Sequence, residues 1–160
     1  MASTEILTKL RQIIRSIHME SKRIEKQYAI SIPQLLTLQY LAQQVNYQSS
    51  ARELKEHLQL NASTISGILS RLEQKGLIAR LPRFRDKRVA YVALTEKGMT
   101  LLDQAPTTLF ERLSDALEKL PTEDIASLHQ HLDFLVTAMG AQDIDASPIL
   151  TSHEFPKNPN

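Results

Sequence analysis

Residues 47–98 read YQSSARELKEHLQLNASTISGILSRLEQKGLIARLPRFRDKRVAYVALTEKG, and this stretch decides the fold. Its capping and apolar residues predict a short helix over 49–58 and a second helix over 61–75, which Gly76 stops. Residues 77–94 then read as a β-hairpin with a cationic tip. Two helices joined by a tight turn and followed by two strands are the layout of a winged helix-turn-helix. We therefore expect a mainly α fold with a small β wing.

The helix predicted over 61–75 has one apolar side and one side of small polar residues. Ile65, Ile68, Leu69 and Leu72 recur at helical spacing and predict a buried stripe. On the other side, short hydroxyl side chains let a helix backbone lie deep in a major groove, and an arginine reaches a phosphate or a guanine. The cap of this helix marks a positive helix end that favours a phosphate. The candidate DNA-binding residues here are Asn61, Ser63, Thr64, Ser66, Gly67, Ser70 and Arg71.

The tip of the hairpin, residues 83–88, holds four cations and one acid. Like charges crowded at a turn destabilise it, so a polyanionic partner is the natural explanation. Arginines on a wing suit a narrow minor groove, where negative potential is focused. Asp86 is interpreted as a structural residue that fixes the hairpin or orients an arginine. The further DNA-binding candidates are Arg83, Arg85, Lys87 and Arg88.

The charge is distributed unevenly along the chain. Residues 47–98 carry ten basic and five acidic side chains, whereas residues 99–160 carry three basic and ten acidic ones. A basic centre followed by an acidic last third fits a nucleic-acid-binding face with a separate solvated end. Chance variation among charged helices is the alternative interpretation.

Apolar side chains at helical spacing predict further helices on both sides of this stretch. Ser31-Ile-Pro-Gln34 forms a capping box that opens the second helix of the chain, and residues 47–50 are interpreted as a polar connector. Pro106 is expected to kink a long helix over 95–119. The remaining helices are predicted over 4–28 and from Pro121 to about residue 140.

The first and last helices carry apolar stripes that need another surface to cover them. The small central module cannot cover both helices and still present its DNA-binding face. Packing against the same helices of a second chain resolves this and gives a two-fold dimer. An intramolecular helical bundle is the alternative. We therefore expect a dimerisation region over residues 1–30 and 99–140, a winged helix-turn-helix module over 31–98, and a flexible tail over 141–160.

The composition argues against several function classes. The chain has no cysteine, which excludes disulfides, zinc thiolate sites and cysteine-based redox sensing. It has neither a run of roughly 20 apolar residues nor a signal-peptide pattern, so we expect a cytoplasmic protein without a membrane partner. His129 and His131 are two residues apart and face different sides of a helix, so no metal is expected. A phosphate-binding glycine loop and a nucleophile–base set are both missing, so neither an enzyme nor a cofactor is expected.

Residues 31–98 resemble the MarR family of winged-helix regulators. The resemblance implies an obligate homodimer on a pseudo-palindromic operator, a transcriptional regulator that acts as a repressor, and release by a small effector held between the dimer helices and the DNA-binding module. Many members carry an arginine where this chain has Gly67, so the base contact of that arginine would be lost here. The matching residues are Pro33-Gln34-Leu35, Leu54, Leu58, Ser63 to Ser66, Arg71-Leu72-Glu73, Lys75 to Ile78, Arg80, Asp86-Lys87-Arg88 and Leu94 to Gly98.

A second resemblance, to the branch that regulates ectoine and other compatible-solute genes, rests on residues 11–23, 33–39 and Ser66-Gly67. It implies an osmotic-stress signal and a betaine-like effector, and quaternary ammonium ligands favour aromatic cages. Arg15 and His18, on one side of the first helix, are candidates for lining an effector pocket, with simple surface exposure as the alternative. The aromatic candidates for the same pocket are Tyr28, Tyr40 and Phe110.

The rival class is a winged helix that docks another protein and reads no DNA sequence. Protein docking would favour exposed aromatic or leucine side chains on the helix and the wing. This chain has hydroxyl and cationic residues there, which favours a sequence-specific DNA-binding regulator.

Overall fold

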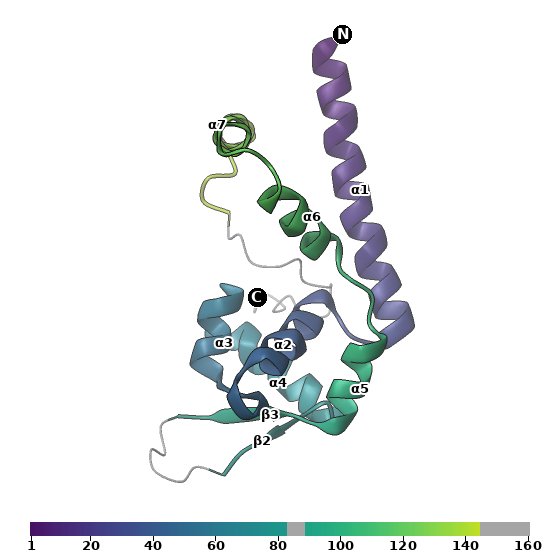
Figure 1. Ribbon diagram of the computed structural model, residues 1–160, viewed down its shortest axis with the longest axis vertical. Coiled ribbons are helices and arrows are strands. Elements are labelled where there is room, and N and C mark those ends of the chain that lie inside the picture. The colour runs from purple at the N-terminus through teal and green to yellow at the C-terminus, as the bar shows by residue number, and fades with distance from the viewer. Residues whose placement is uncertain (83–88, 145–160) are drawn as a thin grey trace, which may run out of the picture. The chain divides into compact units, whose positions relative to one another are not determined.

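The computed structural model describes residues 1–82 and 89–144, while residues 83–88 and 145–160 lie outside the described residues (Figure 1). The described residues fall into two units, residues 1–105 and residues 106–144. The first unit contains α1 (Ala2–Tyr28), α2 (Ile32–Gln43), the short 3-10 helix η1 (Val45–Tyr47), β1 (Gln48–Ser50), α3 (Ala51–Leu58), α4 (Ala62–Gln74), β2 (Ile78–Arg80), β3 (Tyr91–Leu94) and α5 (Glu96–Gln104). The second unit contains α6 (Leu109–Glu118) and α7 (Thr122–Ala138). The predicted mainly α fold with a small β wing is confirmed.

The helices of the first unit begin where the sequence places their caps. Ser31 opens α2 through a reciprocal capping box, because its hydroxyl accepts the Gln34 N–H at 3.3 Å and the Gln34 side chain accepts the Ser31 N–H at 3.1 Å. The side chains of Asn61 and Thr95 accept N–H groups at the start of α4 and α5. Each cap satisfies a backbone donor that the first turn leaves without a helical partner.

The core of the first unit surrounds α2, which packs against α1, α3, α4, α5 and β3. The buried stripe predicted for the helix over 61–75 is confirmed, because Ile65, Ile68, Leu69 and Leu72 are all buried. Fully burying a side chain of this size stabilises the fold by about 1.5–3 kcal/mol. The rest of the apolar core is Ile24, Ile30, Ile32, Leu35, Leu38, Leu41, Leu54, Leu58, Leu60, Leu77, Ile78 and Val92.

The antiparallel sheet has three strands in the order β1-β3-β2. Ala93 of β3 pairs with Gln48 of β1 on one side and with Ala79 of β2 on the other. The interpretation of residues 47–50 as a connector was therefore wrong, since Gln48–Ser50 is a strand. Its three residues are too few for an apolar alternation, and the partner strand that makes it a strand lies about 40 residues further along the chain.

The long helix expected over 95–119 is two helices, and this is a second correction. α5 ends at Gln104, Ala105 adopts an extended conformation (φ −70°, ψ 139°), and Thr108 opens α6 with its own capping box. Proline has no N–H to donate and disfavours helical backbone in the residue before it, so Pro106 ends the helix instead of kinking it. The break coincides with the boundary between the two units.

Both units expose large apolar side chains on their helices. On α1 these include Ile6, Leu7, Ile13 and Ile14, and on α6 and α7 they include Phe110, Leu113, Leu128, Leu132 and Phe134. Among residues 1–82 and 89–144, no helix combines the length and the apolar character needed to cross a membrane.

Candidate nucleic-acid interface

The α3–α4 corner positions the candidate recognition helix. α3 ends at Gln59, which adopts the left-handed conformation (φ 54°, ψ 40°) and reverses the chain. The N–H of the next residue, Leu60, donates to the Lys55 carbonyl at 3.1 Å, and the Leu60 side chain is buried. Asn61 then begins α4 at once, so the turn between the two helices is short and anchored on both sides. This geometry confirms the predicted helix-turn-helix.

The start of α4 is organised by Asn61. Its Oδ1 accepts the Thr64 N–H at 2.8 Å and the Ser63 hydroxyl at 2.8 Å. The cap fixes the first turn and holds the exposed Ser63 side chain against it. The positive end of the helix dipole favours a negatively charged group at this point.

The exposed side of α4 is narrower than the sequence suggested. Ser63 and Ser66 are exposed, and Gly67, Ser70 and Arg71 are partly buried. Thr64 was expected on this side, but its exposed fraction is only 8%. It lies one helical turn before Ile68 and therefore shares the buried face with it. The placement of Thr64 on the exposed side was therefore wrong, and its role as a DNA contact stays a prediction.

Gly67 lies in the middle of the exposed side, next to Arg71 in space. A Cβ built on Gly67 would be 3.8 Å from Nη1 of Arg71, an ordinary contact distance. A glycine inside a helix costs about 1 kcal/mol relative to alanine. The Arg71 guanidinium thus lies along the helix surface at the place where a residue-67 side chain would begin.

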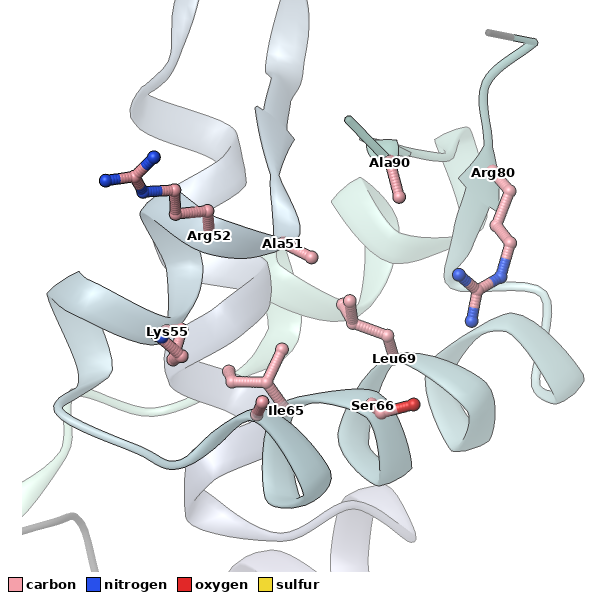
Figure 2. Close-up of a pocket in the computed structure, with 9 residues that line it drawn as sticks. Ala51, Arg52, Lys55, Ile65, Ser66, Leu69, Arg80 and Ala90 are labelled. Atoms are coloured by element: carbon pink, nitrogen blue, oxygen red, sulfur yellow. The ribbon is translucent and has the colours of Figure 1, made fainter. Parts of the chain in front are cut away.

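A groove of about 340 Å³ opens between α3, the first half of α4 and the wing strands. Its apolar floor includes Ile65 and Leu69 of α4. Figure 2 shows Arg52 and Lys55 of α3 on one side of the groove and Arg80 of β2 on the other, with Ser66 of α4 between them. We call these three cations the groove rim. The remaining lining residues are Ala51, Ala62 and Ala90.

Two of the rim cations are held by carboxylates. Arg80 Nε lies 2.8 Å from Glu73 Oε2, which ties the wing strand β2 to α4. Arg52 Nε lies 3.2 Å from Glu56 Oε1 within α3. The sequence-based candidates did not include Arg52, Lys55 or Arg80 as DNA contacts. One signal in the sequence could have found two of them. Arg52 and Lys55 are three residues apart, so they lie on the same side of α3.

The start of α3 contains the one carboxyl group with a resolved pKa shift among the described residues. Glu53 Oε2 accepts the Ser50 N–H at 2.9 Å and the Ser49 hydroxyl at 2.9 Å. The Ser50 backbone N–H lowers the pKa of Glu53 most, the Ser49 hydroxyl and then the Ser50 hydroxyl lower it further, and slight burial opposes them. The ionised carboxylate therefore stabilises the corner between β1 and α3.

Glu53→Gln is expected to make the free energy of unfolding fall less steeply as the pH is lowered. Because the folded pKa lies below the ordinary value of 4.5, the stabilisation is complete above that value and is lost as the pH falls through the folded pKa. Urea unfolding between about pH 3 and pH 7 measures the effect. Ser49→Ala removes one donor and should give an intermediate profile. Parallel wild-type and Glu53→Gln profiles would contradict the assignment.

The wing tip candidates Arg83, Arg85, Asp86, Lys87 and Arg88 lie outside the described residues. The base of the wing is described: the Leu81 N–H donates to the Tyr91 carbonyl at 3.0 Å, one residue beyond the end of β2. The roles of the tip residues stay predictions.

The residues suggested for an effector pocket lie on several elements. Arg15 and His18 are exposed on α1, and Phe110 belongs to α6 of the second unit. Tyr28 packs against the core and its hydroxyl donates to the Gln104 carbonyl at 2.9 Å. Tyr40 also packs against the core and stacks on His57, with 4.2 Å between the ring centroids. The pocket stays a prediction.

In the part of the chain that the structure describes, no three histidine or acidic side chains gather in a way that would hold a metal ion.

Comparison with known proteins gives a family match over the winged-helix part of the chain. Residues 30–90 match the sequence model of the MarR family. The winged-helix segment is therefore similar to the MarR family. The MarR match covers the α2-to-wing region that contains the groove, and it confirms the resemblance that the motifs indicated.

Three curated proteins illustrate the similarity. YsmB of Bacillus subtilis, an uncharacterized HTH-type transcriptional regulator, is 29% identical over 80% of this chain and 86% of its own length. The organic hydroperoxide resistance transcriptional regulator of Bacillus subtilis is 29% identical over 80% of this chain and 89% of its length. The homoprotocatechuate degradative operon repressor of Escherichia coli is 32% identical over 46% of this chain and 47% of its length. All three relatives are named as regulators or repressors, which supports the prediction that this chain is not an enzyme.

Solved structures share the fold. The MepR–DNA complex of S. aureus has a TM-score of 0.60 and 25% identity, covering 82% of this chain and 96% of MepR. The MarR-family regulator AbsC of Streptomyces coelicolor has a TM-score of 0.62 at 19% identity, covering 88% of this chain and 95% of AbsC. AbsC supports the fold alone, and MepR is a structure in which such a fold is bound to DNA.

Proposed function

We propose that this protein is a transcriptional regulator that binds a pseudo-palindromic operator in double-stranded DNA as a homodimer. The observation that carries the proposal is the surface around α4. Small polar residues on the exposed side of this helix lie next to a groove whose rim has cations on both sides, Arg52 and Lys55 on one and Arg80 on the other. The similarity to MepR, whose structure is a DNA complex, supports the same interpretation.

The arrangement fits a helix inserted in a major groove. Phosphates line both edges of that groove, and cations on both sides of an inserted helix would meet them, while short side chains on the helix reach base edges. The Glu73–Arg80 ion pair would keep the wing strand in a fixed place relative to α4. The wing tip would add contacts to the neighbouring minor groove.

A homodimer supplies the two-fold symmetry that an operator of this kind requires. Exposed isoleucine and leucine side chains on α1, and a second exposed set on α6 and α7, form surfaces of the sort that an obligate dimer covers. Dimeric DNA-binding proteins with two-fold symmetry place their recognition helices about 34 Å apart to reach successive major grooves.

We further propose that binding represses transcription, as in the Escherichia coli relative named as a repressor. A thiol cannot be the sensor, because the chain contains no cysteine. Release by a small effector and an osmotic signal stay predictions from the sequence resemblance, as does a cytoplasmic location.

The proposal is tested by recovering genomic fragments that the purified protein binds and measuring their affinity against random competitor DNA. We expect a preferred site with two-fold related half-sites. Affinity should fall by about a thousandfold or more between roughly 50 and 200 mM salt, since each phosphate contact releases counterions. A complex that random DNA displaces as easily as the recovered site, or that salt does not weaken, would favour the protein-docking alternative instead.

A further inference from the structure

Gly67 has no role in the fold that only glycine could fill. Its backbone is not in the left-handed region. Apart from the adjacent residues and the backbone of α4 itself, the one described atom within 4 Å of a Cβ built there is Arg71 Nη1, at 3.8 Å. Gly98 shows the contrast, because its Cβ would lie 2.3 Å from the Leu77 carbonyl oxygen. Alanine would fit at position 67 and would stabilise the helix. The reason for glycine at this position therefore lies outside the molecule, on the surface that α4 presents.

The surface at Gly67 is apolar and partly exposed. Backbone N–H groups in the middle of a helix donate within the helix, so the surface of a mid-helix glycine presents mainly Cα hydrogens. No side-chain atom of Ser70 lies within 4 Å of a Cβ built at Gly67, and the Arg71 guanidinium borders this position on one side. A group that fills this space would be small and apolar, with a polar or charged neighbour next to it.

We propose that Gly67 is a specificity-determining position, at which the space left by the missing side chain accepts the 5-methyl group of a thymine. This inference rests on the proposed function. The thymine methyl is the one apolar group that unmodified base pairs present in the major groove. The Arg71 guanidinium lies on the border of the same space and can reach a neighbouring phosphate or guanine. A Cβ at position 67 would occupy the volume that the methyl group needs.

The test removes the thymine methyl group from the DNA and, separately, adds a methyl group to the protein at position 67. In the recovered operator, each thymine of the half-sites is replaced in turn by deoxyuridine, at symmetric positions, and binding is measured for wild type and Gly67→Ala. At one thymine per half-site, removal of the methyl should weaken wild-type binding by about threefold to tenfold. Gly67→Ala should lose a similar factor on the unmodified operator and lose nothing more on the deoxyuridine operator.

Two further measurements separate specificity from stability. Gly67→Ala should raise the unfolding midpoint by about 2–4 °C while leaving the affinity for random DNA unchanged. Gln74→Ala, an exposed change at the end of the same helix, should leave both affinities unchanged. The inference would be overturned if Gly67→Ala bound the operator as tightly as wild type, or if it lost as much affinity for random DNA as for the operator. It would also be overturned if no deoxyuridine substitution weakened binding of the variant less than binding of wild type. A wild-type protein that selects no operator would instead overturn the proposed function, and this inference with it.

Discussion

Replacing Gly98 by alanine is expected to lower the free energy of unfolding by about 3 kcal/mol. The added Cβ would lie 2.3 Å from the Leu77 carbonyl oxygen and 2.6 Å from Leu94 Cδ1. The Leu77 backbone is the neighbour that cannot give way easily. The Leu77 carbonyl accepts the Thr95 N–H at 3.1 Å, and the Leu77 side chain is buried in the core. Relief of the clash would move the first turn of α5 away from the base of the wing.

The measurement is urea unfolding of the purified variant, with Thr100→Ala as an exposed control on the same helix. The control is expected to change the stability by less than about 1 kcal/mol. At temperatures where Gly98→Ala stays folded, weaker DNA binding should accompany the displaced wing base. A stability equal to that of the control would show that α5 shifts at no cost, contrary to the close packing of Gly98 against the Leu77 backbone.

Local signals in the sequence predicted much of the fold. Helix caps depend on neighbours three residues away. Ser31, Asn61 and Thr95 could therefore be recognised as N-caps without any knowledge of tertiary structure. The apolar stripe of α4 was readable for the same reason, since its spacing is a local property. Thr64 was misplaced because a hydroxyl residue was assumed to belong to the polar side, whereas its position relative to Ile68 puts it on the buried one.

Features that depend on distant partners were missed. β1 is a strand because β3 pairs with it, and no apolar alternation marks its three residues. The groove is formed by α3, α4 and the wing strands. Arg80 could therefore be assigned to the groove rim only once the structure placed β2 beside Glu73 of α4. The break between α5 and α6 had a visible cause in Pro106, but whether proline kinks or ends a helix depends on the cap that follows. Here Thr108 starts a new helix and settles the outcome.

Placing two carboxylates in the exposed apolar stripe of α1 is expected to abolish operator binding by preventing dimerisation. Ile13 and Ile14 are 56% and 49% exposed in the single chain, although both are large apolar side chains. Glutamate keeps the helix propensity of the segment, so Ile13→Glu/Ile14→Glu should leave α1 helical. An unpaired carboxylate buried in an interface costs about 3 kcal/mol or more, and two-fold symmetry applies the cost twice.

We expect sedimentation to show a dimer for wild type and a monomer for the double variant, with operator affinity reduced by about a hundredfold or more. Gln12→Glu is the matched control, because it adds a carboxylate at an exposed polar position of the same turn and should leave both the dimer and the affinity intact. The far-ultraviolet circular dichroism of all three proteins should agree, which separates loss of the dimer from loss of the helix. A double variant that remains dimeric and binds the operator would show that α1 does not form the dimer interface. In that case its apolar stripe would be covered within one chain, and the symmetry of the operator would have to come from another surface.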